Sequence, residues 1–192
     1  MLVIGIVWFC LSACWYGFMI WLPEFLEAKH DNTYLGNLIT SSGDLPGNVL
    51  SFFLIEKIGR KKCLLFSLVG AAVTPLAFAA APKGSQVWAM AGSAAFGCAS
   101  VGGWNALSIL SPELFHTDIR ATMHGFLTAL GRLGGFMGTY FVGHFQKAGV
   151  WLPCIFASSI LGLGCVATLF VPETQGKVLT EYHGETPNKD SP

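Results

Sequence analysis

Long apolar runs dominate this sequence, and short polar stretches separate them. A membrane-spanning helix needs about 20 predominantly apolar residues, because each residue advances the helix by about 1.5 Å. The runs are continuously apolar, which favours helices over the alternating pattern of a β-barrel. The pattern predicts six spanning helices, at about residues 2–22, 35–55, 63–81, 86–110, 121–146 and 150–171.

The composition supports an integral membrane protein. Hydrophobic residues make up 53% of the chain and charged residues 11%, whereas a soluble domain carries roughly 25% charged residues. The formal net charge is zero, so no basic surface suggests nucleic-acid binding. The predicted fold class is an all-α membrane protein, with a six-helix bundle over residues 1–171 and a cytosolic polar tail over residues 172–192.

Loop charges predict the orientation, because cytoplasmic loops carry an excess of lysine and arginine. One side has Lys57, Arg60, Lys61, Lys62, Arg120, Lys177 and Lys189. The other side has Lys29, Lys83 and Lys147. We therefore expect both termini in the cytosol. Six crossings place both ends on the same side, which is consistent with this expectation.

Small residues recur at four-residue spacing around Arg132, and the pairs are Gly131/Gly135 and Gly134/Gly138. Such pairs allow two helix backbones to approach closely. Six cysteines also lie in the apolar segments. Buried cysteine usually acts as a small hydrophobe, so we expect no metal site and no cofactor.

Three polar stretches are more specific. They read "IEKIGRKK" (55–62), "SPELFHTDIR" (111–120) and "VPETQGK" (171–177). Together they closely resemble the turns of the second half of a major facilitator superfamily transporter of the sugar-porter-like branch. The resemblance implies helices seven to twelve of a twelve-helix transporter, arranged as two three-helix repeats. It also implies solute transport by alternating access, with the N-terminal six-helix half as partner.

The resemblance further implies a cytoplasmic gating network. Its members in this sequence would be Glu56, Gly59, Arg60, Lys61, Glu113, Arg120 and Glu173. The alternative is a solvated charged edge that only orients the protein in the membrane. His116 departs from the family pattern, which usually has proline at this position.

Other segments bear on the branch of the family. The sugar-porter elements expected in the first and fourth helices are missing, whereas "WYGFMIWLP", "GDLPG" and "RATMHGFLTALGRLGG" resemble niacin permeases, synaptic-vesicle two-related proteins and organic ion transporters. We therefore expect secondary active transport of a small organic anion, such as an aromatic carboxylate. The alternatives are a sugar transporter and a non-transporting vesicle or membrane regulator or receptor.

Two charges lie far from the predicted membrane surface. Arg132 follows Arg120, and Asp44 precedes Glu56, by twelve residues, or roughly 18 Å of helix. A charge at this depth costs at least about 2.5–3.5 kcal/mol, so each group needs water, a partner or a solute. Arg132 is predicted to bind an anionic solute group, and Asp44 to couple transport to protons. Alternatively, the two residues pair with each other.

Other polar and aromatic residues complete the predicted site. Thr128 and His124 lie on the same helix row as Arg132, and His124 is a second candidate for proton coupling or simply a polar residue near a helix end. Asn105 is a further substrate-binding candidate. The aromatic residues that could stack on a solute ring are Trp15, Tyr16, Phe18 and Trp104. Trp15 and Tyr16 could instead pack in the core. The other tryptophans, which we expect at the membrane interface or in the core, are Trp8, Trp21, Trp88 and Trp151.

The sequence contains no nucleophile, metal-ligand or nucleotide-binding motif, so we expect neither an enzyme nor a pump. The predicted partners are the lipid bilayer and a small-molecule solute, with no nucleic acid. The predicted location is a plasma or vesicle membrane, which the chain crosses several times.

Overall fold

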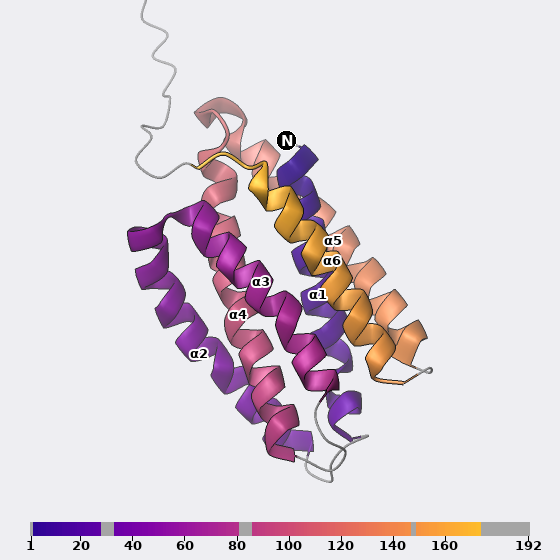
Figure 1. Cartoon of the computed structure of the whole chain (residues 1–192). Coiled ribbons are helices and arrows are strands. Elements are labelled where there is room, and N and C mark those ends of the chain that lie inside the picture. The colour runs from indigo at the N-terminus through magenta and orange to yellow at the C-terminus, as the bar shows by residue number, and fades with distance from the viewer. Residues whose placement is uncertain (1, 28–32, 81–85, 147–148, 174–192) are drawn as a thin grey trace, which may run out of the picture.

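The computed structural model describes residues 2–27, 33–80, 86–146 and 149–173. Within these ranges the chain forms six α-helices and no β-strand (Figure 1). The all-α prediction is therefore confirmed. The helices are α1 (Leu2–Glu27), α2 (Thr33–Ile58), α3 (Arg60–Ala79), α4 (Gln86–Glu113), α5 (Thr117–Gln146) and α6 (Trp151–Leu169).

Most helices are longer than predicted, and the additional residues lie at their polar ends. In particular, α3 begins at Arg60, α4 continues to Glu113 and α5 begins at Thr117. An apolar run marks only the part of a helix that suits the hydrocarbon layer, and the backbone can stay helical where charged side chains are hydrated. Of the polar tail, residues 174–192 lie outside the described residues, and so do the predicted loop charges Lys29, Lys83, Lys147, Lys177 and Lys189.

The helix contacts follow a repeating scheme. Helix α1 packs mainly against α5 and α6, α4 packs mainly against α2 and α3, and α3 also packs against α6. If α1, α2 and α3 are exchanged with α4, α5 and α6 respectively, the same pairs of helices remain in contact. Because successive helices run in opposite directions, α1 and α4 are antiparallel (Figure 1). The bundle therefore consists of two interlocked, inverted three-helix units, as transporter folds often do.

Glycines allow two of these helix pairs to approach closely. Gly134 and Gly138 of α5 lie against the backbone of Phe9 and Ala13 in α1, where no β-carbon would fit. The equivalent contact between α2 and α4 places Gly43 and Gly47 against Ala94 and Cys98. The predicted close helix contact around Arg132 is confirmed, and it fixes α1 beside α5.

The core lies between α1, α3, α4 and α6. Its largest fully buried aliphatic side chains include Leu11, Leu64, Leu68, Leu107 and Leu161. Phe18 also belongs to this core.

Phe18 is only 1% exposed. Its ring centroid lies 5.5 Å from that of Phe78 and 4.7 Å from that of Phe96. The prediction that Phe18 stacks on a solute is therefore wrong, because its surface is already covered by other rings.

The outer surface is strongly apolar. Large hydrophobic side chains are exposed on every described helix, among them Ile20, Phe52, Phe66, Trp88, Phe136 and Leu163. Such a surface suits lipid or another protein rather than water. By length and composition, three stretches within the described residues could each cross a membrane: Leu2–Leu22, Arg60–Ala79 and Trp151–Leu169. The other helices, α2, α4 and α5, are longer but carry more polar and small residues.

Candidate functional site

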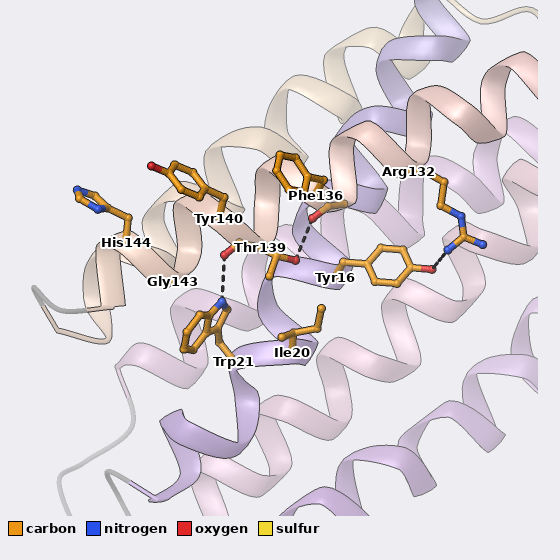
Figure 2. Close-up of a pocket in the computed structure, with 10 residues that line it drawn as sticks. Tyr16, Ile20, Trp21, Arg132, Phe136, Thr139, Tyr140, Gly143 and His144 are labelled. Carbon is orange, nitrogen blue, oxygen red and sulfur yellow. Dashed lines mark hydrogen bonds between the residues drawn. The ribbon is translucent and has the colours of Figure 1, made fainter.

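Arg132 lies near the middle of α5, with its side chain exposed beside α1. Its Nη1 atom donates a hydrogen bond of 2.9 Å to the hydroxyl of Tyr16, as Figure 2 shows. The guanidinium carbon also lies 5.9 Å from the centroid of the Tyr16 ring. A guanidinium carries five N–H donors. Since no carboxylate pairs with Arg132 within the described ranges, most of these donors remain available to a solute.

Asp44 is not the partner of Arg132. It lies on α2, which packs against α4, whereas Arg132 lies where α5 packs against α1. The two side chains form no ion pair, and the Oδ1 atom of Asp44 is buried without a hydrogen-bond partner among the described residues. The alternative in which these two charges pair is therefore wrong, because they belong to different helix pairs.

Two hollows meet at Arg132 and Tyr16. The larger, here called the α1–α5 cavity, has a volume of about 640 Å³ and is open on one side. Its lining residues are Tyr16, Ile20, Trp21, Arg132, Gly135, Phe136, Thr139, Tyr140, Gly143 and His144. The smaller, here called the tryptophan hollow, has a volume of about 60 Å³ and is lined by Trp8, Ser12, Tyr16, Trp104, Thr128, Gly131 and Arg132. The structure thus brings four predicted site residues together: Tyr16, Trp104, Thr128 and Arg132.

Aromatic rings surround the tryptophan hollow in edge-to-face contacts. The centroid of Trp104 lies 5.5 Å from that of Trp8 and 6.2 Å from that of Trp15. Trp15 in turn lies 4.8 Å from Tyr16. The Trp8 indole donates a hydrogen bond of 2.7 Å to the hydroxyl of Ser111, which holds its orientation. The result is a connected aromatic group that links α1 and α4 next to the cation on α5.

Two tryptophans were missed as candidate site residues. Trp8 is only 5% exposed and lines the tryptophan hollow. Trp21 donates a hydrogen bond of 3.0 Å to the Thr139 carbonyl and lines the α1–α5 cavity. The spacing of seven from Trp8 to Trp15 could have placed both residues on one helix face. Nothing in the sequence signalled that Trp21 would pack against α5.

Trp88 and Trp151 are 65% and 56% exposed. Of the two predicted locations, the interface belt and the core, their exposure excludes the core and is compatible with the interface belt.

Asn105 lies apart from Arg132. Its side-chain amide donates hydrogen bonds of 2.9 Å to Asn48 Oδ1 and 2.7 Å to Ser51 Oγ. These bonds join α4 to α2, and Asn105 lines neither of the two hollows. A role for Asn105 in solute binding stays a prediction.

His124 lies next to the aromatic group. Its ring contacts Trp8 edge-on, with 5.7 Å between the centroids. Its Nδ1 atom is buried and has no hydrogen-bond partner among the described residues, and its backbone carbonyl accepts a hydrogen bond of 2.8 Å from the Thr128 hydroxyl. His124 is therefore close to the site, and its role in proton coupling stays a prediction.

The predicted gating residues gather at one end of the bundle, where α2 joins α3, α4 joins α5 and α6 ends (Figure 1). Arg60 and Glu113 form an ion pair with 3.5 Å between Nε and Oε1. The Lys61 backbone N–H donates to Glu173 Oε1 at 3.4 Å, and Lys61 Nζ donates to the Leu169 carbonyl at 2.7 Å. Glu173 at the start of α3 and the Lys61 ammonium at the end of α6 also suit the dipoles of these helices. Together the contacts tie α3 to α4 and α6.

The remaining members of the predicted network lie at the same end. Glu56 is exposed in the last turn of α2. Arg120 lies in the first turn of α5, and its Nε atom is buried without a hydrogen-bond partner in the described part of the chain. The geometry brings the residues together, and their role in gating stays a prediction.

Gly59 makes the single-residue turn between α2 and α3. Its φ of 100° and ψ of 160° are essentially restricted to glycine. We expect Gly59→Ala to destabilise the protein by about 1–3 kcal/mol, measured by thermal unfolding in detergent. Gly162→Ala is the control, because nothing lies within 4 Å of its added β-carbon. Equal melting temperatures for the two variants would contradict this prediction.

Fold and site together define the class of protein: a helical membrane protein built from inverted repeats, with a cation and aromatic rings beside an open cavity. Comparison with known proteins identifies the family. The family described as "Sugar (and other) transporter" matches residues 1–185. The chain belongs to this family of the major facilitator superfamily, and the six helices of its described residues make one half of that fold. The family consists of transporters, so the expectation that the chain is not an enzyme is confirmed.

Individual relatives fall into two groups. Human "Synaptic vesicle glycoprotein 2A" is 39% identical over 151 residues, which cover 77% of this chain and 19% of that protein. The "Putative niacin/nicotinamide transporter NiaP" of Bacillus subtilis (strain 168) is 30% identical over 171 residues, which cover 85% of this chain and 42% of that protein. Rat "Synaptic vesicle glycoprotein 2B" is 33% identical over 160 residues. The chain thus spans less than half the length of each of these relatives.

Proposed function

We propose that this chain supplies the anion-binding side of a secondary transporter for small organic anions that carry an aromatic ring. The observation that supports this most is Arg132, a cation in the middle of a membrane helix whose described partner is the neutral Tyr16 hydroxyl. A charge at this depth must face water, a partner or a solute. Here it faces the α1–α5 cavity and the tryptophan hollow.

The chemistry of the guanidinium supports a carboxylate as the bound group. Its planar fork can donate two parallel hydrogen bonds to a carboxylate, and such bonds are stronger than those between neutral groups. The hydrogen bond to Tyr16 uses Nη1 and holds the fork beside α1. Arg132 is thereby oriented before a solute arrives, which reduces the entropy lost on binding.

The rings beside Arg132 support an aromatic solute. Trp8, Trp15, Tyr16 and Trp104 form a chain of rings in which the centroids of successive neighbours are 4.8–6.2 Å apart. Aromatic pairs contribute about 0.5–1.5 kcal/mol beyond the burial of their area. The Bacillus subtilis relative is named as a putative niacin/nicotinamide transporter, and niacin is an aromatic carboxylic acid.

The coupling of transport to protons is a further part of the proposal. Asp44 and His124 are the groups proposed to carry the coupled proton, and each has a buried side-chain atom without a described hydrogen-bond partner. They lie on different helices, α2 and α5. Either group could respond to movement of its own helix.

Alternating access would require the cytosolic end of the bundle to be closed in one state and open in the other. We propose that the contacts of Arg60, Lys61, Glu113 and Glu173 close the cytosolic end in one state and break in the other. A six-helix N-terminal half would complete the cavity, and both termini would lie in the cytosol of a plasma or vesicle membrane.

A non-transporting membrane regulator is the second candidate, favoured by the 39% identity to synaptic vesicle glycoprotein 2A. In that case the cavity would bind a ligand without moving it. Sugar transport is a third candidate, because the family description includes sugars. A sugar has no charge to pair with Arg132, which disfavours it.

Uptake by cells that express the complete transporter containing this chain tests the proposal. The labelled solutes are nicotinate, benzoate, tetraethylammonium and glucose. We expect saturable uptake of the two aromatic acids and none of the cation or the sugar. Binding of the acids without uptake would favour the regulator, and uptake of only tetraethylammonium or glucose would overturn the proposal.

A further inference from the structure

The α1–α5 cavity has a second end that the proposed carboxylate site does not use. Arg132 and His144 both line this cavity, and Figure 2 shows them at opposite ends of it. They belong to one continuous helix and are twelve residues apart, which corresponds to roughly 18 Å along the axis. A single-ring acid held by Arg132 cannot also reach His144.

The middle of the cavity offers mainly rings and methyl groups, with the Tyr140 hydroxyl as a further polar group. Ile20, Phe136 and Tyr140 are 55%, 73% and 66% exposed along it. The polar atoms of Thr139 are already bonded, because its hydroxyl donates to the Gly135 carbonyl at 2.9 Å and its carbonyl accepts from Trp21. The middle therefore suits an apolar or aromatic segment of a ligand.

His144 ends this apolar stretch with a group that can hydrogen-bond. Its side chain is exposed and contacts Phe145 with 6.0 Å between the ring centroids. An imidazole donates at least one N–H in either protonation state. The volume of about 640 Å³ is within the 300–1,000 Å³ of sites that hold drug-sized ligands.

From this arrangement we propose that the solute is an elongated aromatic anion with a second oxygen acceptor at its far end. Its carboxylate binds Arg132, its rings lie along Ile20, Phe136 and Tyr140, and its second acceptor takes a hydrogen bond from His144. This inference rests on the proposed function for the role of Arg132, and it adds both the length of the solute and His144 as a specificity residue.

Three probes separate length from the second acceptor. Benzoate is short, biphenyl-4-carboxylate is long, and biphenyl-4,4′-dicarboxylate is long with an acceptor at each end. We would measure their dissociation constants by isothermal titration calorimetry with the complete purified transporter in nanodiscs. We expect the dicarboxylate to bind about tenfold more tightly than the monocarboxylate, the gain from one charge-assisted hydrogen bond. Benzoate should bind most weakly.

Variants assign the gain to His144. His144→Ala should remove the tenfold preference for the dicarboxylate over biphenyl-4-carboxylate. His144→Gln, which keeps an N–H donor, should retain part of the preference. His116→Ala is the matched control, because His116 is an exposed histidine between α4 and α5 and lines neither hollow. Circular dichroism and gel filtration establish that each variant is folded.

The outcomes separate this inference from the function on which it rests. If Arg132→Gln weakens both biphenyl probes but His144→Ala leaves the preference intact, the anion site stands and the role of His144 is overturned. If Arg132→Gln weakens neither probe, or no probe binds the folded protein, both are overturned. Equal affinity for the two biphenyl probes in the unsubstituted protein also overturns the inference, and would indicate that another helix covers the His144 end of the cavity.

Discussion

Replacing Arg132 with glutamine is expected to lower kcat/KM for uptake of an aromatic acid by about 100-fold. Glutamine keeps most of the length and some hydrogen bonding but removes the charge. Breaking a charged hydrogen-bonded pair in a binding site costs about 2–5 kcal/mol, and every 1.4 kcal/mol corresponds to a factor of ten. The measurement is initial-rate uptake of labelled nicotinate, normalised to the amount of protein at the cell surface.

Two further variants separate the charge of Arg132 from its geometry. Arg132→Lys keeps the charge but loses the planar fork, so we expect an intermediate loss of about tenfold. Tyr16→Phe removes the hydroxyl that accepts from Nη1 while keeping the ring, and we expect a loss of several-fold, roughly the value of one hydrogen bond. A pre-oriented anion site requires this order of losses in kcat/KM, which is largest for Arg132→Gln, intermediate for Arg132→Lys and smallest for Tyr16→Phe.

The result would contradict the prediction if Arg132→Gln transported nicotinate at the normal rate with normal surface expression. Arg132 would then serve the structure rather than the solute. Its structural role would then be the contact with Tyr16, which joins α5 to α1.

The fold could be predicted because its main determinants are local. Runs of about 20 apolar residues leave few alternatives to a spanning helix. The glycines around Arg132 also signalled a close contact correctly, since only small residues let two helices touch at their backbones. The helix ends were predicted less well. Arg60, Glu113 and Thr117 are polar, and hydropathy does not report whether a polar residue continues a helix or leaves it.

The site could be predicted only in part because it depends on which helices are neighbours. Arg132 could be identified from the sequence because a charge inside the membrane has a high free-energy cost. Recognising that cost does not require knowing which helices are neighbours. Its pairing with Asp44 was wrong because the sequence does not show that α5 packs against α1 while α2 packs against α4. The same information was needed to find Trp21 and His144, which enter the cavity only because of the contact between α1 and α5.

The close contact between α1 and α5 at the glycines is physically linked to the proposed anion site. Gly131, Gly134 and Gly138 lie on the face of α5 that meets α1, and Arg132 lies on the same two turns. The close approach of the two backbones brings the Tyr16 hydroxyl within 2.9 Å of Arg132 Nη1.

This link leads to the second large effect, which is expected for Gly138→Ala. The added β-carbon would overlap the Ala13 carbonyl group, whose carbon atom lies 2.6 Å from the β-carbon position. The obstacle is backbone, which cannot rotate away as a side chain could. Overpacking of this kind costs about 1–3 kcal/mol or more. We expect the melting temperature of the purified protein to fall by roughly 5–10 °C and binding of aromatic acids to weaken.

Gly125→Ala is the matched control, because it makes the same change in the same helix with nothing within 4 Å of the new β-carbon. Alanine is the better helix former by about 0.5–1 kcal/mol, so this variant should be at least as stable as the unsubstituted protein. If Gly138→Ala and Gly125→Ala had the same melting temperature and bound benzoate equally well, the close contact between α1 and α5 would not set the position of Arg132. A lower melting temperature with unchanged binding would show that the contact stabilises the bundle without orienting the site.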